Sequence, residues 1–261
     1  EKALEYYSKS LAIRKELGDK KGIIKSYNKI GLIYDKQGNY EKALEYYSKS
    51  LLIYKELSNK KGMGASWNNI GNIYCNQGNY EKSLYYYKKY LNISEEIGDK
   101  YGIASSSSNI GILYYDQGDN EKALEYFRGS IAVKEEINAS VGTQYFNVAC
   151  ILLEQNNLNE ALITFHKIEK MNNESRKNED QGQIYVFDAL SRTYHKLKNT
   201  QQALDYANQA INLSEKLNYS FGKSFSYNTA AEIYKSIGKT KKSIECANKS
   251  LSTSTLSGKQ A

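Results

Sequence analysis

A glycine recurs at a step of 40 residues along this chain, at Gly22, Gly62, Gly102, Gly142, Gly182 and Gly222. The segments QGNYEKALEYYSKSLLI, QGNYEKSLYYYKKYLNI and QGDNEKALEYFRGSIAV, which start at Gln37, Gln77 and Gln117, are near copies of one another. A fixed step of this length is typical of repeat proteins, in which each unit buries its apolar face against its neighbours. The first residues, EKALEYY, match the middle of a copy. We therefore predict one solenoid over 1–251, with a half repeat at 1–19 and then six repeats of about 40 residues, and a polar tail at 252–261.

Each repeat is predicted to be a hairpin of two helices. In the first full repeat, apolar residues fall at helical spacing at Tyr27, Ile30 and Tyr34, and again at Leu44, Tyr47 and Leu51. Between these stretches, Gly38 suits the left-handed position after a helix, and Asn39 suits the cap of the next one. The chain is therefore expected to be all-α, with about 13 helices.

Small residues indicate how the two helices of a hairpin meet. Gly31, Gly71 and Gly111 lie inside the first helix, where glycine costs roughly 1 kcal/mol relative to alanine. The second helix carries a small residue at a matching position, Ala43, Ser83 or Ala123. This pattern predicts a close approach of the paired helices, with tyrosine and phenylalanine rings filling the adjoining layers.

The second full repeat carries the spacing of a known family, with Trp67, Ile70, Gly71 and Tyr74 in its first helix and Ser83 and Tyr87 in its second. This spacing resembles the tetratricopeptide repeat, although the period is longer than the usual 34 or so and there is no proline. The resemblance implies a right-handed superhelical solenoid of antiparallel hairpins whose first helices line a concave groove.

The fourth full repeat departs from the pattern. Its turn at Asn156 and Asn157 comes two residues early, and a long polar loop is predicted at 172–181. A local change in the path of the solenoid is expected there.

An asparagine row is predicted on the inner surface of the first helices, formed by Asn28, Asn68, Asn69, Asn72, Asn109 and Asn147. An amide side chain offers two donors and an acceptor, so such a row could bond the backbone of an extended peptide whatever its sequence. The alternative is that exposed asparagines are ordinary in an asparagine-rich chain.

An apolar pocket is predicted beside this row. Phe146, Cys150 and Leu153 stand at i, i+4 and i+7, next to Ile112 and Tyr115 of the preceding repeat. The alternative is that the irregular fourth repeat turns these residues into its own core.

Positive charge follows further along the inner surface, at Arg192 and His195. An acidic partner segment or a free carboxylate could bind there, and a solvated mixed surface is the alternative.

Composition excludes several other classes of protein. The net charge of +7 is spread among acidic residues, which argues against nucleic acid as a partner. The longest apolar run, 148–153, is far shorter than the roughly 20 residues of a membrane span. Cys75, Cys150 and Cys246 are widely separated, which indicates neither a disulfide framework nor zinc and favours the cytoplasm. No catalytic motif is present, so we expect no enzyme, metal or cofactor.

Two functions are consistent with these features. The first is a protein-interaction scaffold that binds an extended or helical peptide segment in its groove through the asparagine row and the apolar pocket. The second is a regulatory or sensor region of a larger signalling protein, in which a change of curvature controls an attached output domain.

The ends of the sequence suggest a fragment of a longer chain, because it opens with half a repeat and lacks an initiator methionine. Leu4, Tyr7 and Leu11 are expected to lack their partner helix, so the terminal helices could also self-associate.

Overall fold

The computed structural model describes residues 2–175 and 180–257, and this part of the chain is all-α, as predicted, with no strand. Its helices are α1 (Lys2–Glu16), α2 (Lys20–Lys36), α3 (Tyr40–Glu56), α4 (Lys60–Asn76), α5 (Tyr80–Glu96), α6 (Lys100–Asp116), α7 (Asn120–Glu136), α8 (Gly142–Glu154), α9 (Leu158–Glu174), α10 (Gln181–Lys196), α11 (Thr200–Lys216), α12 (Ser220–Ser236) and α13 (Thr240–Ser257). The even-numbered helices are the first helices of the hairpins, and the odd-numbered ones are the second helices.

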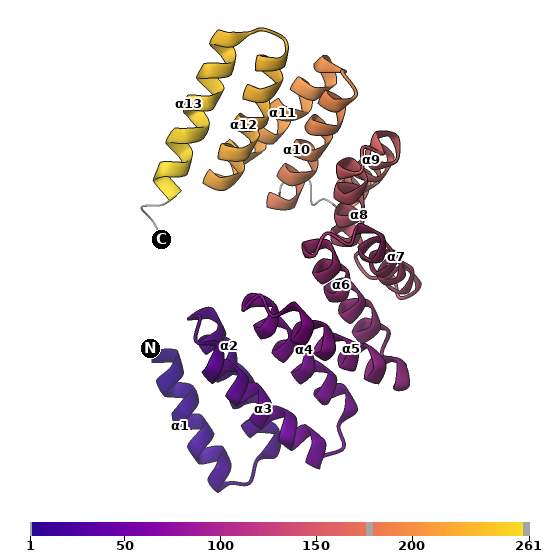
Figure 1. Ribbon diagram of the computed structural model, residues 1–261. Helices are drawn as coiled ribbons and strands as arrows, with labels where there is room; N and C mark the ends of the chain where they lie inside the picture. The colour runs from indigo at the N-terminus through magenta and orange to yellow at the C-terminus, as the bar shows by residue number, and fades with distance from the viewer. Residues whose placement is uncertain (1, 176–179, 258–261) are drawn as a thin grey trace. The chain divides into compact units, whose positions relative to one another are not determined.

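The chain forms two compact units, Glu1–Ser140 with α1 to α7 and Val141–Ala261 with α8 to α13. Within each unit, consecutive helices pack as antiparallel neighbours, and first helices also contact one another, as α4 does with α6 and α10 with α12 (Figure 1). Each unit is therefore a helical-repeat solenoid with one layer of first helices and one of second helices.

The turns within the hairpins have the chemistry that the sequence predicted. Gly38 has a φ of 71°, in the left-handed region that glycine adopts without steric cost. Asn39 then accepts a hydrogen bond from the backbone N–H of Lys42 at 3.2 Å and so caps α3. Asn79 and Asp119 cap α5 and α7 in the same way.

The close approach within each hairpin is confirmed, with one refinement. The Oγ of Ser83 donates to the carbonyl of Gly71 at 2.9 Å, so the two small residues do meet. What lies directly over the glycine, however, is a ring: a Cβ at Gly71 would stand 2.6 Å from Cε1 of Tyr87. The rings of Tyr47 and Phe127 cover Gly31 and Gly111 in the same way.

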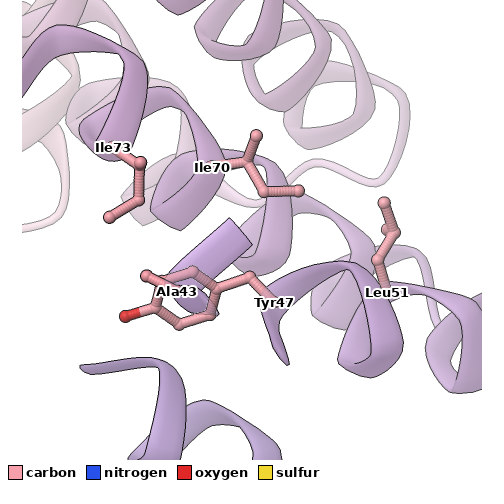
Figure 2. Packing of buried hydrophobic residues seen from close by; sticks show 5 residues of the cluster. All are labelled: Ala43, Tyr47, Leu51, Ile70 and Ile73. Atoms are coloured by element: carbon pink, nitrogen blue, oxygen red, sulfur yellow. The ribbon is translucent and has the colours of Figure 1, made fainter. Parts of the chain in front are cut away.

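The core repeats this packing from hairpin to hairpin. In Figure 2, Ala43, Tyr47 and Leu51 of α3 lie against Ile70 and Ile73 of α4, the first helix of the following repeat. Because α3, α5, α9 and α11 each pack on two first helices, burial of the apolar residues is continuous along a unit.

The fourth full repeat is irregular at its start as well as at its turn. Asp19 and Asn59 cap α2 and α4, but Ala139 stands at the matching position and has no side-chain acceptor. The first helix of this repeat, α8, begins only at Gly142 and has 13 residues, whereas α2 and α4 have 17. The early turn is confirmed, since Asn156 takes the left-handed position with a φ of 61°.

Two predicted boundaries are wrong. Residues 172–174, expected in a loop, are helical, because α9 has no glycine or proline to stop it and continues to Glu174; residues 176–179 lie outside the described part. Helix α13 is described as far as Ser257 instead of ending near 251.

Helix α1, at the start of the chain and a second helix by its position in the repeat, packs against α2. Leu11 is buried against Ile23 and Tyr27 of α2, and Leu4 and Tyr7 pack around this cluster. Helix α2 of the next repeat therefore covers part of this apolar face, while Leu4 and Tyr7 stay half-buried. Across the described residues, no helix is both long and apolar enough to cross a membrane.

Candidate interaction surface of the first helices

Neighbouring first helices are joined by hydrogen bonds between residues 41 positions apart. Nδ2 of Asn109 on α6 donates to Oδ1 of Asn68 on α4 at 2.8 Å. Nδ2 of Asn76 on α4 donates to Oδ1 of Asp35 on α2 at 3.2 Å. The predicted asparagine row is thus brought together in unit 1, but part of it is used to bond one first helix to the next. Among the described residues, the NH2 group of Asn68 and the side-chain oxygen of Asn109 have no further hydrogen-bond partner.

Asn72 is held by the second helix of its own hairpin. The hydroxyl of Tyr87 donates to Oδ1 of Asn72 at 2.6 Å, and burial raises the pKa of this phenol, so it remains a donor. The amide NH2 of Asn72 is left for other partners.

Three further asparagines are half-buried and unbonded. Asn69 and Asn147 form no hydrogen bond with any residue that the structure describes. Asn28 is also half-buried, and its Oδ1 is shielded from solvent without a partner. Buried amide groups are normally satisfied, so these side chains retain unused hydrogen-bonding capacity on the surface where the sequence predicts a ligand.

Of the predicted pocket residues in unit 1, Ile112 is 39% exposed and Tyr115 is half-buried. In unit 2, Leu153 is only 3% exposed, and the ring of Phe146 packs edge-on against the buried Phe165 of α9 at 5.8 Å. The apolar pocket is therefore wrong for Leu153, which lies in the core, whereas the half-buried Phe146 stays a prediction.

The reason lies in the composition of α8. The run 148–153 is apolar on every side of the helix, so most of it is buried in unit 2 instead of facing outward. Cys150 is half-buried, and desolvation raises the pKa of its thiol to about 12, so it stays protonated.

The first helices of unit 2 are joined by an equivalent bond. Oγ1 of Thr229 on α12 donates to Oδ1 of Asp188 on α10 at 2.7 Å, again 41 residues apart. Burial raises the pKa of the Asp188 carboxyl to about 6, although the bond from Thr229 and the charge of Arg192 oppose this. Arg192 is exposed and His195 half-buried, and neither bonds a described residue.

An aromatic cluster that the sequence analysis missed lies one helical turn from Asp188. Tyr185 of α10 stacks on Phe225 of α12 with ring centroids 5.1 Å apart, and Phe221 packs edge-on against Phe225. Phe221 is 60% exposed. The repeat period could have indicated this aromatic cluster, because Tyr185 and Phe225 occupy the same position in consecutive repeats.

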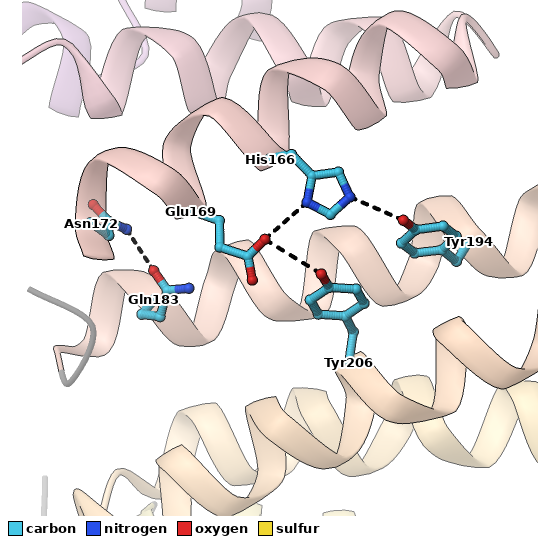
Figure 3. Close-up of polar contacts among 6 residues, drawn as sticks. All are labelled: His166, Glu169, Asn172, Gln183, Tyr194 and Tyr206. Carbon is cyan, nitrogen blue, oxygen red and sulfur yellow. Dashed lines mark hydrogen bonds and ion pairs between the residues drawn. The ribbon is translucent and has the colours of Figure 1, made fainter. Parts of the chain in front are cut away.

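A polar cluster ties second helices to first helices in unit 2 (Figure 3). Nδ1 of His166 lies 2.9 Å from Oε2 of Glu169, and its Nε2 lies 3.0 Å from the hydroxyl of Tyr194. Tyr206 also donates to Glu169, at 3.4 Å. All four residues have partners within the unit, so the cluster has a structural role. No group of side chains in the described part could hold a metal ion.

The fold defines a class of protein, the all-α helical-repeat solenoid. Family models of the tetratricopeptide repeat match residues 1–56 and 62–136, and also 184–217 and 226–254. The chain belongs to the tetratricopeptide repeat family.

Solved structures have the same fold at low sequence identity. BtubC (BKLC) from P. vanneervenii has a TM-score of 0.73 at 17% identity, over 83% of this chain and 91% of that one. The apo form of RapI has a TM-score of 0.65 at 17% identity, over 98% and 99% of the two chains. The apo quorum sensor NprR from B. thuringiensis has a TM-score of 0.73 at 20% identity, over 96% and 70%. A comparison with curated protein sequences gives no match.

Proposed function

We propose that this chain is a protein-interaction scaffold whose first-helix surface holds an extended or helical segment of a partner protein. The observation that supports this proposal is the set of half-buried asparagines with unused amide groups, above all Asn69 and Asn147. An amide bonds both the N–H and the C=O of a peptide backbone. Each such bond contributes only about 0.5–1.5 kcal/mol, so several must act together with apolar contacts.

A sensor role is the second candidate. The structural likeness to a quorum sensor, NprR, favours it, since this chain spans 70% of that protein and leaves room for a further part. In both roles the same surface binds the partner, and they differ in whether binding alters an attached domain.

The test is a selection from a random peptide library displayed on phage, with the full chain as bait. Selected peptides are then measured against the double variant Asn69→Ala and Asn147→Ala. Because neither side chain forms a hydrogen bond with a described residue, we expect weaker binding, by about 0.5–1.5 kcal/mol for each of the two residues that a given peptide contacts, with an unchanged melting temperature.

The matched control is Asn92→Ala with Asn208→Ala, which removes one exposed asparagine from a second helix of each unit. A library that yields no binder, or peptides that bind the two double variants equally well, would refute the proposal.

A further inference from the structure

Four lysines form a stripe along the exposed face of α2. Lys21, Lys25, Lys29 and Lys36 are all exposed, and helical spacing places them on one side of the helix together with Leu32. None of the four forms an ion pair with a carboxylate in the part of the chain that the structure describes. Lys20 differs from them, because it pairs with Glu56 at 2.9 Å.

This stripe is unfavourable for the free protein. Like charges four residues apart on a helix repel one another, and Lys21, Lys25 and Lys29 form two such pairs in succession. The one acidic residue of α2, Asp35, accepts a hydrogen bond from Asn76 at the margin of the stripe. An anionic partner would remove the repulsion.

The same helical positions carry different chemistry on the next two first helices. On α4, the positions that match Lys29, Leu32 and Lys36 are Asn69, Asn72 and Asn76. On α6, the positions that match Lys21 and Leu32 are Tyr101 and Ile112, both exposed. The hydrogen bonds from Asn76 to Asp35 and from Asn109 to Asn68 hold these three helices side by side. At these positions the surface changes from lysine through amide to apolar, although Lys61 of α4, which matches Lys21, is also exposed and pairs with Asp99 at 3.4 Å.

We propose that the first-helix surface of unit 1 binds an acidic segment of a partner protein. Its carboxylates lie over the lysines of α2, its backbone bonds the asparagines of α4, and an apolar side chain contacts Tyr101 and Ile112 of α6. This inference rests on the proposed function and names the chemistry of the partner.

The order of these surfaces, from the lysines of α2 through the asparagines of α4 to the apolar residues of α6, favours a polypeptide over other polyanions. A nucleic acid or an anionic membrane presents a continuous array of phosphates, which calls for basic residues along the whole surface. On α4, the positions that match Lys29, Leu32 and Lys36 carry no cation, and α6 carries Asp116 at the position that matches Lys36. Carboxylates, backbone amides and an apolar side chain occur together only in a peptide.

The experiment repeats the peptide selection with two baits, the wild-type chain and the variant Lys21→Glu, Lys25→Glu and Lys29→Glu. We expect peptides rich in Asp and Glu from the wild-type chain and peptides rich in Lys and Arg from the variant. A selected acidic peptide should lose about tenfold or more in affinity when its acids are changed to Asn or Gln, and a similar factor on the variant, corresponding to about 1.4 kcal/mol.

The control variant Lys2→Glu, Lys55→Glu and Lys88→Glu makes the same charge change on second helices of unit 1. If it alters binding as much as the α2 variant, the effect is one of net charge and the inference fails. If peptides are selected and depend on Asn69 but show no acidic preference, the inference fails while the proposed function stands. If no peptide is selected, both fail.

Two further probes separate other polyanions from peptides. Phosphatidylserine vesicles and a single-stranded oligonucleotide are tested against both baits. Binding of either probe through the α2 lysines, when no acidic peptide binds, overturns the inference in favour of a membrane or nucleic-acid partner.

Discussion

At the scale of single residues, glycine positions follow from the sequence, whereas the rings that cover them do not. The recurrence of Gly31, Gly71 and Gly111 predicts a close contact, and the contact exists. That the partner is the ring of Tyr87 and not only Ser83 depends on the rotation of α5 about its axis, which periodicity fixes only coarsely.

Replacing Gly71 with Ala tests this packing. The new Cβ would stand 2.6 Å from the Tyr87 ring, which is buried and anchored to Asn72, so the ring cannot move aside freely. We expect a loss of about 1–3 kcal/mol in the free energy of unfolding, measured by urea denaturation. Gly129→Ala in α7 is the matched control, because nothing lies within 4 Å of its Cβ and the gain in helix propensity should stabilise by up to about 1 kcal/mol. Equal stability of the two variants would contradict the packing described here.

At the scale of helices, α2 and α4 begin at a capping side chain that α8 lacks, although α12 begins on the regular register without one. The turns before α4 and α8 share one backbone hydrogen bond. The N–H of Asn59 donates to the carbonyl of Tyr54, and the N–H of Ala139 donates to the carbonyl of Lys134. The matching position, Ala139, lacks the capping side chain of Asn59, and the first backbone bond of α8 goes from the N–H of Tyr145 to the carbonyl of Val141 instead.

The change Ala139→Asp should supply that cap. We expect a gain of about 0.5–2 kcal/mol in unfolding free energy and slower amide hydrogen exchange just before Gly142. The reverse change, Asn59→Ala, removes the hydrogen bond from the N–H of Gly62 and should cost a similar amount. A loss of stability in Ala139→Asp would show that α8 begins late for another reason.

The packing of neighbouring helices also explains which part of the surface could not be predicted from the sequence. Counting by the period of 40 aligns Asn69 with Asn109, but the bonds between first helices join residues 41 apart, as from Asn109 to Asn68. Neighbouring helices are offset along their axes, and the offset comes from packing geometry that a repeat length does not contain. Hence the row of asparagines was predictable, and the division between bonded and unbonded members was not.

At the scale of the whole molecule, the charge is less evenly spread than the sequence suggests. The first helices of unit 1, α2, α4 and α6, carry eight lysines and two aspartates, so their net charge of +6 nearly equals the +7 of the entire chain. Lys60 is partly neutralised by Glu96, at 2.5 Å, but such exposed pairs contribute little. The first-helix layer of unit 1 is therefore locally positive, although unit 1 as a whole, with 21 basic and 18 acidic residues, has a net charge of only +3.

This distribution predicts that partner binding and stability oppose each other on α2. Lys25→Glu turns two repulsive spacings, with Lys21 and Lys29, into attractive ones, so it should stabilise the free protein by about 0.5–1 kcal/mol at low salt. The gain should shrink toward zero near 1 M salt, where the screening length falls to about 3 Å. Thermal unfolding at both salt concentrations measures it. Lys88→Glu on α5 has no lysine at these spacings and serves as the control for net charge. A Lys25→Glu variant that is less stable at low salt would mean that the stripe is already neutralised within the chain, and the argument for an acidic partner would lose its physical basis.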